Sequence, residues 1–363
     1  MWSGATGTLI RAWDGEWPDG LFGHWVMPVP DLSGDGLADV IIAAPHGTID
    51  GKMRGVVVAR SPKTGAELWK HGETATEVEN FGWDLTLAGD DDGDGRTDLF
   101  VGAPAFDDGR VYLLSGKDGT VLRTYAPQKE GGSFGWYLGR VDDLDGDGRR
   151  DLAVGGPFAA DAAGTKLGGV WVLSSRTGRE LYHWKGTDQR GGFGGVVAAL
   201  GDLDGDGKGE IAVAAPATED QTRTLPGEVH VYSGATGKEL RHWSGSQSGE
   251  EFGRMVVAAG DLDADGVEDL AIAAPWHRRK TADRVGRVEL RSGRSGEVLS
   301  ELFGDEAECW FGWHITRAPD PDGHGRPALL IGSLYHPVDG KGAVGVLDLY
   351  VLRRGRKTRI KGR

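Results

Sequence analysis

The sequence predicts an all-β protein, a β-propeller of six four-stranded antiparallel blades, from three observations. The dipeptide Phe-Gly recurs at Phe22, Phe81, Phe134, Phe193, Phe252 and Phe311, with spacings of 59, 53, 59, 59 and 59 residues. An acidic, glycine-containing loop follows each Phe-Gly at a similar distance. Glycine makes up 62 of the 363 residues, which indicates many tight turns. A repeat of about 50 to 60 residues with short strands is typical of propeller blades.

Each repeat contains four strand-like segments, shown here for the fourth repeat. Residues 196–202 (VVAALGD) and 210–216 (EIAVAAP) are rich in Val, Ile and Ala, which favour strands. Residues 227–232 (GEVHVY) form a third segment, and 238–243 (KELRHW) form a fourth that partly alternates apolar and polar residues. The pattern therefore predicts two buried inner strands, a third strand and a half-exposed outer strand.

The termini suggest how the ring closes. The chain begins within a repeat, so residues 8–13 (TLIRAW) are expected to pair with residues 345–352 (GVLDLYVL) and complete the sixth blade. The competing segment is RKTRIKG, which lacks the Leu and Trp of other outer strands. We therefore expect one propeller domain over residues 1–353 and a basic C-terminal tail over 354–363.

Five acidic loops carry the strongest chemical signal. They read DLSGDGLAD, DDDGDGRTD, DLDGDGRRD, DLDGDGKGE and DLDADGVED, with side-chain oxygens at positions 1, 3, 5 and 9 and glycine at position 6. Hard oxygen ligands on alternate residues suit Ca²⁺, which takes six to eight of them. The expected ligands are Asp31, Ser33, Asp35, Asp39, Asp90, Asp92, Asp94, Asp98, Asp143, Asp145, Asp147, Asp151, Asp202, Asp204, Asp206, Glu210, Asp261, Asp263, Asp265 and Asp269.

About five calcium ions are therefore expected. The sixth loop, DPDGHGRPA, has His324 at position 5 and Ala328 at position 9, so we expect it to be empty. The alternative is that the loops are solvated Asp-Gly turns. A formal charge of −14 disfavours nucleic acid as a partner, and no run of 18 apolar residues predicts a membrane span.

Taken together, Phe-Gly, the acidic loop and a strand end such as Gly102-Ala103-Pro104 resemble the FG-GAP repeats of the integrin α-subunit β-propeller and its bacterial relatives. The resemblance implies calcium-stabilised blades whose metal loops line one face while ligands meet the other. Integrin-type heads have seven blades and this sequence has six units, so a seven-bladed ring remains an alternative. Some propellers of similar repeats are lectins, which leaves protein and sugar ligands both open.

On the rim opposite the calcium loops, we expect the loops between second and third strands and between blades to bind a ligand. The candidate residues there are Trp276, His277, Arg278, Arg279, Trp310, Tyr335 and His336. Aromatic side chains can stack on sugars or anchor proteins, and arginines can meet an anionic group. The alternative is packing between blades, which we also assign to the periodic Trp83, Trp136 and Trp313.

No catalytic motif accompanies the ten histidines, so we expect no enzyme activity. The expected function is calcium-dependent adhesion or recognition of a protein or glycan ligand, by a monomer that is secreted or on a cell surface. The chain shows no signal sequence. The alternatives are a lectin-like or polysaccharide-active enzyme on a propeller scaffold, and a purely structural surface protein.

Overall fold

The structure is a computed structural model that describes residues 1, 6, 8–49, 52–72, 80–105, 109–127, 132–188, 191–217, 224–279, 283–318, 328–338, 341–343, 345–353 and 356–361. Regular structure in this part of the chain consists of strands, in six four-stranded sheets and two two-stranded ribbons. No helix there is long and apolar enough to cross a membrane.

The first three blades follow chain order. The first contains β1 (Trp25–Val29), β2 (Asp39–Ala44), β5 (Val56–Arg60) and β6 (Glu67–Gly72). The second contains β7 (Leu85–Gly89), β8 (Asp98–Ala103), β9 (Arg110–Leu114) and β10 (Val121–Tyr125). The third contains β11 (Tyr137–Arg140), β12 (Leu152–Gly156), β13 (Gly169–Leu173) and β14 (Glu180–Lys185). A ribbon of β3 (Thr48–Ile49) and β4 (Lys52–Met53) extends from the first blade.

The last three blades repeat the arrangement. The fourth contains β15 (Val196–Ala199), β16 (Ile211–Ala215), β17 (Glu228–Tyr232) and β18 (Glu239–Ser244). The fifth contains β19 (Val256–Gly260), β20 (Asp269–Ala274), β21 (Arg287–Arg291) and β22 (Val298–Phe303). The sixth contains β23 (Phe311–Ala318), β24 (Ala328–Ser333), β27 (Val346–Arg353) and β28 (Arg356–Lys361), with a ribbon of β25 (Pro337–Val338) and β26 (Lys341–Ala343). The prediction of six four-stranded antiparallel blades is confirmed.

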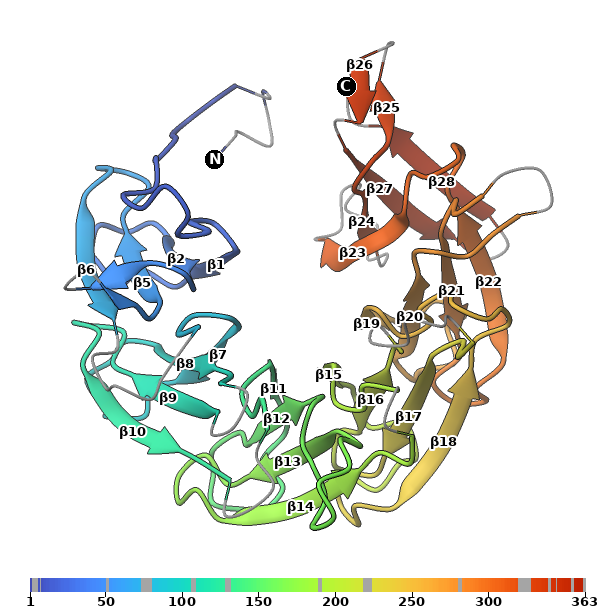
Figure 1. Cartoon of the computed structure of the whole chain (residues 1–363), viewed down its shortest axis with the longest axis horizontal. Coiled ribbons are helices and arrows are strands. Elements are labelled where there is room, and N and C mark those ends of the chain that lie inside the picture. The colour runs from blue at the N-terminus through green and yellow to red at the C-terminus, as the bar shows by residue number, and fades with distance from the viewer. Residues whose placement is uncertain are drawn as a thin grey trace.

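The blades pack face to face around a common axis, with the first strand of each blade innermost and the fourth outermost (Figure 1). Because both faces of a blade are covered, second strands such as β2, β8 and β20 are buried along their whole length. Outer strands such as β18 alternate exposed and half-buried residues. Five apolar clusters fill the spaces between neighbouring blades and form the core.

The Phe-Gly dipeptide locks one blade to the next, as the second repeat shows. The Phe81 side chain is fully buried between the first and second blades. Gly82 has a φ of 90°, a left-handed conformation that favours glycine, and its main-chain N–H donates to Gly102 O at 2.9 Å. A Cβ on Gly82 would lie 3.0 Å from Val57 Cγ2, so glycine also permits the close packing.

The predicted closure by the N-terminal strand is wrong. The outer strand of the sixth blade is β28, which includes most of RKTRIKG and pairs with β27 over Asp348 to Lys361. Only two residues separate β27 from β28, so this hairpin costs less loop entropy than pairing with residues 8–13. Residues 356–361, assigned to a basic tail from sequence, therefore belong to the last sheet.

Residues 8–13 instead pack on the turn of the first blade. Trp13 donates its indole Nε1–H to Gly65 O at 3.3 Å, and Arg11 donates to Pro62 O and Lys63 O at 3.1 Å. Trp184 of β14 makes the corresponding bond to Gly237 O, in the turn of the fourth blade, at 2.9 Å. Trp13 therefore takes the place that an outer-strand tryptophan of a preceding blade would take.

Candidate functional site

Each acidic loop joins the first and second strands of its blade and is held by its own main chain. In the third loop, the Asp143 carboxylate accepts hydrogen bonds from the N–H groups of Gly146, Asp147 and Gly148 at 2.6 to 3.1 Å. The Asp147 carboxylate accepts from Arg149 N at 2.9 Å. These bonds curl the loop so that carboxylates at alternate positions point into its centre.

Four loops bring ligand atoms within 4.8 Å of one another. The groups are Asp90, Asp92 and Asp94; Asp143, Asp145 and Asp151; Asp202, Asp204, Asp206 and Glu210; and Asp261, Asp263 and Asp265. Three buried oxygens in these loops, Asp145 Oδ1, Asp147 Oδ2 and Glu210 Oε1, have no hydrogen-bond partner. Buried carboxylate oxygens without a donor are costly, and a hard divalent cation such as Ca²⁺ would satisfy them. The donor set therefore fits calcium.

In the second, third and fifth loops, the ninth residue also ties the loop to the turn before the fourth strand. In the second loop, Asp98 Oδ2 accepts from Asp91 N at 2.6 Å and Asp98 Oδ1 accepts from Gly116 N, in the turn before β10, at 3.0 Å. Burial raises the pKa of Asp98 to about 6, with the charges of Asp92 and Asp94 adding to the shift. A cation among these groups would remove much of that cost.

The first loop differs from the other four at position 3, which is Ser33 instead of aspartate. Its Asp35 Oδ2 accepts a hydrogen bond from Ser61 Oγ at 2.9 Å, as Asp206 Oδ2 of the fourth loop does from Ser233 Oγ at 3.2 Å. Asp39 is nevertheless buried and accepts from Leu32 N and Ser33 N, as in the other loops. In the sixth loop, residues 319–327, which include Asp320, Asp322 and His324, lie outside the described residues, so its expected emptiness stays a prediction.

At the other end of the first strands, a pocket of about 380 Å³ lies on the propeller axis. All six repeats line it with the same two positions, the two residues that follow Phe-Gly. The lining residues are His24, Trp25, Trp83, Asp84, Trp136, Tyr137, Gly195, Val196, Arg254, Met255, Trp313 and His314. The fourth repeat contributes only Gly195 and Val196, and these small side chains leave room for the pocket.

Aromatic rings form opposite walls of this axial pocket. On one side, the Trp83 ring lies 4.8 Å from His24 and 4.7 Å from Trp136, centroid to centroid. On the other side, the Arg254 guanidinium lies 4.4 Å from the centroid of the Trp313 ring. Aromatic walls with a few polar groups are typical of ligand pockets.

The axial pocket carries little charge apart from one arginine. Burial lowers the pKa of both His24 and His314, and the nearby Arg254 lowers that of His314 further. Burial raises the pKa of Asp84 to about 7, against hydrogen bonds from Leu138 and Leu85 that lower it. At neutral pH both imidazoles are therefore uncharged, and Arg254 is the cation among the twelve lining residues.

Three of the sequence-predicted ligand residues gather beside this pocket. The Trp310 ring lies 5.6 Å from Trp276, 4.5 Å from Tyr335 and 5.3 Å from Trp313, which lines the pocket. Trp276 and Trp310 are half-buried and Tyr335 is exposed. The aromatic surface therefore extends from the axis onto the fifth and sixth blades.

The other four predicted ligand residues are engaged in local contacts. His277 is buried, and its Nδ1 lies 2.5 Å from Glu250 Oε2. Arg278 pairs with Asp283 at 3.2 Å, and His336 pairs with Asp305 at 2.9 Å. The Arg279 guanidinium lies 4.5 Å from the Phe303 ring centroid. The structure therefore does not bring these four together with the three aromatic residues as one constellation.

The sequence did not predict the pocket, because the tryptophans after Phe-Gly were assigned to packing. Trp83 and Trp136 do pack on each other, and they also line the pocket. A signal was nevertheless present. The pair after Phe-Gly changes from repeat to repeat, as His-Trp, Trp-Asp, Trp-Tyr, Gly-Val, Arg-Met and Trp-His, whereas Phe-Gly itself does not change. Positions that serve only the repeated fold would keep one residue type.

Comparison with protein families identifies the repeat. The FG-GAP repeat model matches residues 22–58, 81–114 and 135–173, and the FG-GAP-like repeat model matches residues 202–272. The chain contains FG-GAP repeats. Together these matches include the first to fifth acidic loops and the Phe-Gly dipeptides of the first, second and fifth repeats.

The FG-GAP repeats are similar to those of integrin α subunits. Chicken (Gallus gallus) integrin alpha-V is 31% identical over 202 residues, which cover 51% of this chain and 19% of that protein. Xenopus laevis integrin alpha-5 is 30% identical over 237 residues, covering 61% and 22%, and human (Homo sapiens) integrin alpha-IIb is 33% identical over 221 residues, covering 57% and 20%. The chain thus spans about a fifth of the length of these relatives.

Solved structures support the fold of the FG-GAP propeller. The Saccharomyces cerevisiae protein Sqt1 matches with a TM-score of 0.54 and 11% identity, over 94% of this chain and 72% of that one. The exotype rhamnogalacturonan lyase YesX matches with a TM-score of 0.50 and 16% identity, over 93% and 56%. At these identities the likeness shows the propeller architecture alone.

Proposed function

We propose that this protein is a calcium-dependent, non-catalytic recognition or adhesion module. It binds a protein or glycan ligand on the face opposite the calcium loops, at the axial pocket and the adjoining Trp276, Trp310 and Tyr335. The observation that carries the proposal is the convergence of all six repeats on one aromatic pocket. Similarity to integrin α subunits supports an adhesion role at the cell surface or outside the cell.

Calcium holds the blades that frame this face. The expected five ions bind at the loops beginning with Asp31, Asp90, Asp143, Asp202 and Asp261. Four of these loops gather ligand atoms within 4.8 Å, and unpartnered buried oxygens occur in two of them. Extracellular calcium reaches millimolar levels, which would fill loops of modest affinity. The protein acts as a monomer in this proposal.

The chemistry of the pocket favours binding over catalysis. Its walls are indole and imidazole rings with one guanidinium, and burial keeps Asp84 protonated below a pH of about 7. Rings of this kind stack on sugar faces or receive apolar anchors, and the arginine can pair with a carboxylate or sulfate group of the ligand. Occupation of the pocket requires no bond to be broken.

The test is a binding screen against a glycan array and a panel of surface proteins, in calcium and in chelator. Wild-type protein should bind one ligand class, and Trp136→Ala and Arg254→Gln should each weaken that binding at least tenfold. Val121→Ala, at an exposed site on the outer strand β10, is the control and should bind normally. Binding that the pocket variants leave unchanged would refute the pocket, and turnover of a bound glycan would refute the non-catalytic assignment.

A further inference from the structure

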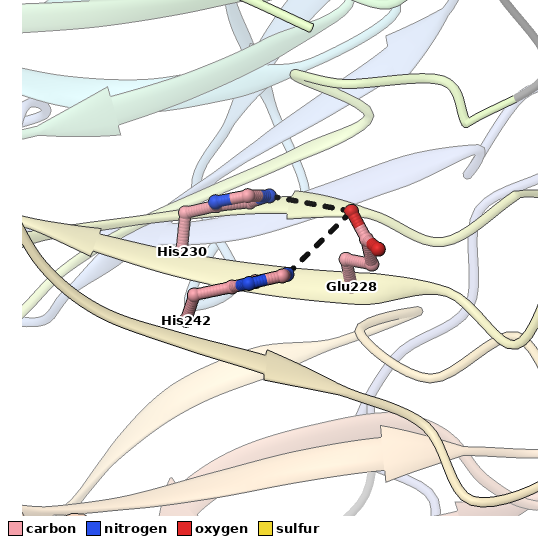
Figure 2. A group of neighbouring side chains, drawn as sticks. All are labelled: Glu228, His230 and His242. Atoms are coloured by element: carbon pink, nitrogen blue, oxygen red, sulfur yellow. Dashed lines mark ion pairs between the residues drawn. The ribbon is translucent and has the colours of Figure 1, made fainter. Parts of the chain in front are cut away.

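A cluster of two histidines and a glutamate lies on the third and fourth strands of the fourth blade, apart from both sites above. His230 on β17 and His242 on β18 are directly opposite each other in the antiparallel pairing. Glu228 precedes His230 by two residues, so its side chain lies on the same face of β17. Figure 2 shows the Glu228 carboxylate facing both imidazoles.

The distances within this cluster suit a tetrahedral metal ion. Glu228 Oε2 lies 3.6 Å from His230 Nε2 and 3.6 Å from His242 Nε2. The three ligand atoms lie within 4.8 Å of one another. Zinc bonds of about 2.0 to 2.1 Å place tetrahedral ligand atoms roughly 3.3 to 3.4 Å apart. Movements of a few tenths of an ångström would bring the carboxylate and each imidazole to that separation.

The His230 ring is oriented by a fourth side chain. Glu239 Oε1 lies 3.2 Å from His230 Nδ1, so with an ion bound Nδ1 would donate its proton to Glu239 and Nε2 would face the ion. A carboxylate behind a ligating histidine is the usual support of a metal site. The His230 and His242 rings stack, with centroids 4.4 Å apart and planes inclined by 9°, so the exposed His242 ring has to turn before both nitrogen lone pairs can point to one ion.

The same register positions serve other purposes in the neighbouring blades. In the fifth blade they hold Arg287, Glu289 and Glu301, and the Arg287 guanidinium bridges both carboxylates at 2.6 and 2.9 Å. In the third blade the position of His242 holds His183, which stacks on Trp171 at 4.7 Å. The fourth blade replaces the bridging arginine with Glu228.

We propose that Glu228, His230 and His242 bind one zinc ion, with Glu239 as the supporting carboxylate. Two imidazoles and one carboxylate suit Zn²⁺ and its borderline neighbours Co²⁺ and Ni²⁺, whereas Ca²⁺ prefers oxygen ligands alone. A cavity of about 150 Å³, lined by Glu228, His230 and Glu239 and also by Lys185, gives an ion access to the cluster. The ion would clamp β17 to β18 at the outer side of the blade.

The test is a cobalt titration of the full chain in saturating calcium, which keeps the acidic loops occupied. We expect one equivalent of Co²⁺ with the visible absorption of a four-coordinate nitrogen and oxygen site, displaced by Zn²⁺. His230→Gln with His242→Gln should abolish this signal, and Glu239→Gln should weaken binding about 10- to 100-fold. His183→Gln, the matched substitution in the third blade, should bind as wild type does.

Thermal melting in calcium without cobalt checks that each variant folds. The proposal is wrong if wild-type protein shows no such absorption at millimolar Co²⁺, or if the double variant binds Co²⁺ with wild-type affinity and spectrum. It is also wrong if His183→Gln loses the signal as fully as the double variant.

Discussion

Val26 on β1 and Leu347 on β27 are both exposed, although the residues at the same two positions of neighbouring blades are buried together at every described blade interface. The equivalent pairs, Val57 with Leu85, Val111 with Leu138, Val170 with Val197, Val229 with Val256 and Val288 with Ile315, each lie in one buried cluster. Val26 is 57% exposed and Leu347 is 55% exposed, because the first and sixth blades are separated in the structure (Figure 1). Their faces are the uncovered ends of an otherwise continuous stack.

Truncation to alanine should therefore lower the free energy of unfolding strongly at a covered position and hardly at all at the two exposed positions. Leu85→Ala, at the covered position, should lower the free energy of unfolding by about 2 to 5 kcal/mol because it leaves a cavity. Val26→Ala and Leu347→Ala should change it by less than about 0.5 kcal/mol. Urea unfolding in saturating calcium measures each value. A large loss for both exposed variants would show that their faces are covered in solution.

Asp84 should make stability depend on pH. Asp84 Oδ2 accepts a hydrogen bond from Leu138 N of the third blade at 2.7 Å, and burial raises its pKa to about 7. The folded protein therefore keeps a proton that the unfolded chain loses above about pH 4. Its contribution to the free energy of unfolding is complete below pH 4 and is lost as pH rises to 7.

The comparison of wild type with Asp84→Asn isolates this effect, because the other carboxylates titrate in both proteins. Between pH 5 and pH 7, the stability of wild type relative to the variant should fall by about 2 kcal/mol. Urea unfolding at the two pH values measures it. Parallel pH profiles for the two proteins would contradict the raised pKa.

Ala264 should be a point of strain in the fifth acidic loop. Its φ is 62°, in the left-handed region, whereas the same position in the other four calcium loops is Gly34, Gly93, Gly146 or Gly205. Ala264→Gly should raise the free energy of unfolding by about 1 kcal/mol, since alanine is disfavoured there by about 1 to 2 kcal/mol. Gly205→Ala is the reverse test and should destabilise. A loss of stability in Ala264→Gly would show that the loop imposes no strain.

Much of the fold could be predicted from the sequence because each repeat carries the same local sequence motifs. Phe-Gly, the acidic loop and the turn before the fourth strand recur at fixed spacing, so the strands and their order follow. The closure could not be predicted, because residues 8–13 and 356–361 both have a strand-like pattern and only the short connection after Arg353 decides between them. The axial pocket also could not, since it forms only when six separate segments meet.

The C-terminal hairpin should matter more for solubility than the N-terminal segment. Deleting residues 356–363 removes β28 and leaves β27 as an unpaired edge that can pair with other molecules. Deleting residues 1–13 removes the Trp13 contact with Gly65 but leaves the described strand pairs of all six blades intact. Light scattering against concentration should show aggregation of the first protein and not of the second. The reverse result would restore the N-terminal segment as the closing strand.

Calcium removal should destabilise the whole propeller. Carboxylates held within 4.8 Å of one another repel when no cation is present, and a metal that binds mainly the folded state raises its stability. Chelation should lower the melting temperature, and calorimetric titration should count about five ions. Asp204→Asn should remove or weaken at least tenfold one of these sites, because it takes a ligand from the fourth loop, whereas Asp14→Asn, at an exposed carboxylate outside the loops, should leave the count unchanged. A melting curve that chelator does not shift would mean that the loops are solvated turns, and equal counts for wild type and Asp204→Asn would place the ions elsewhere.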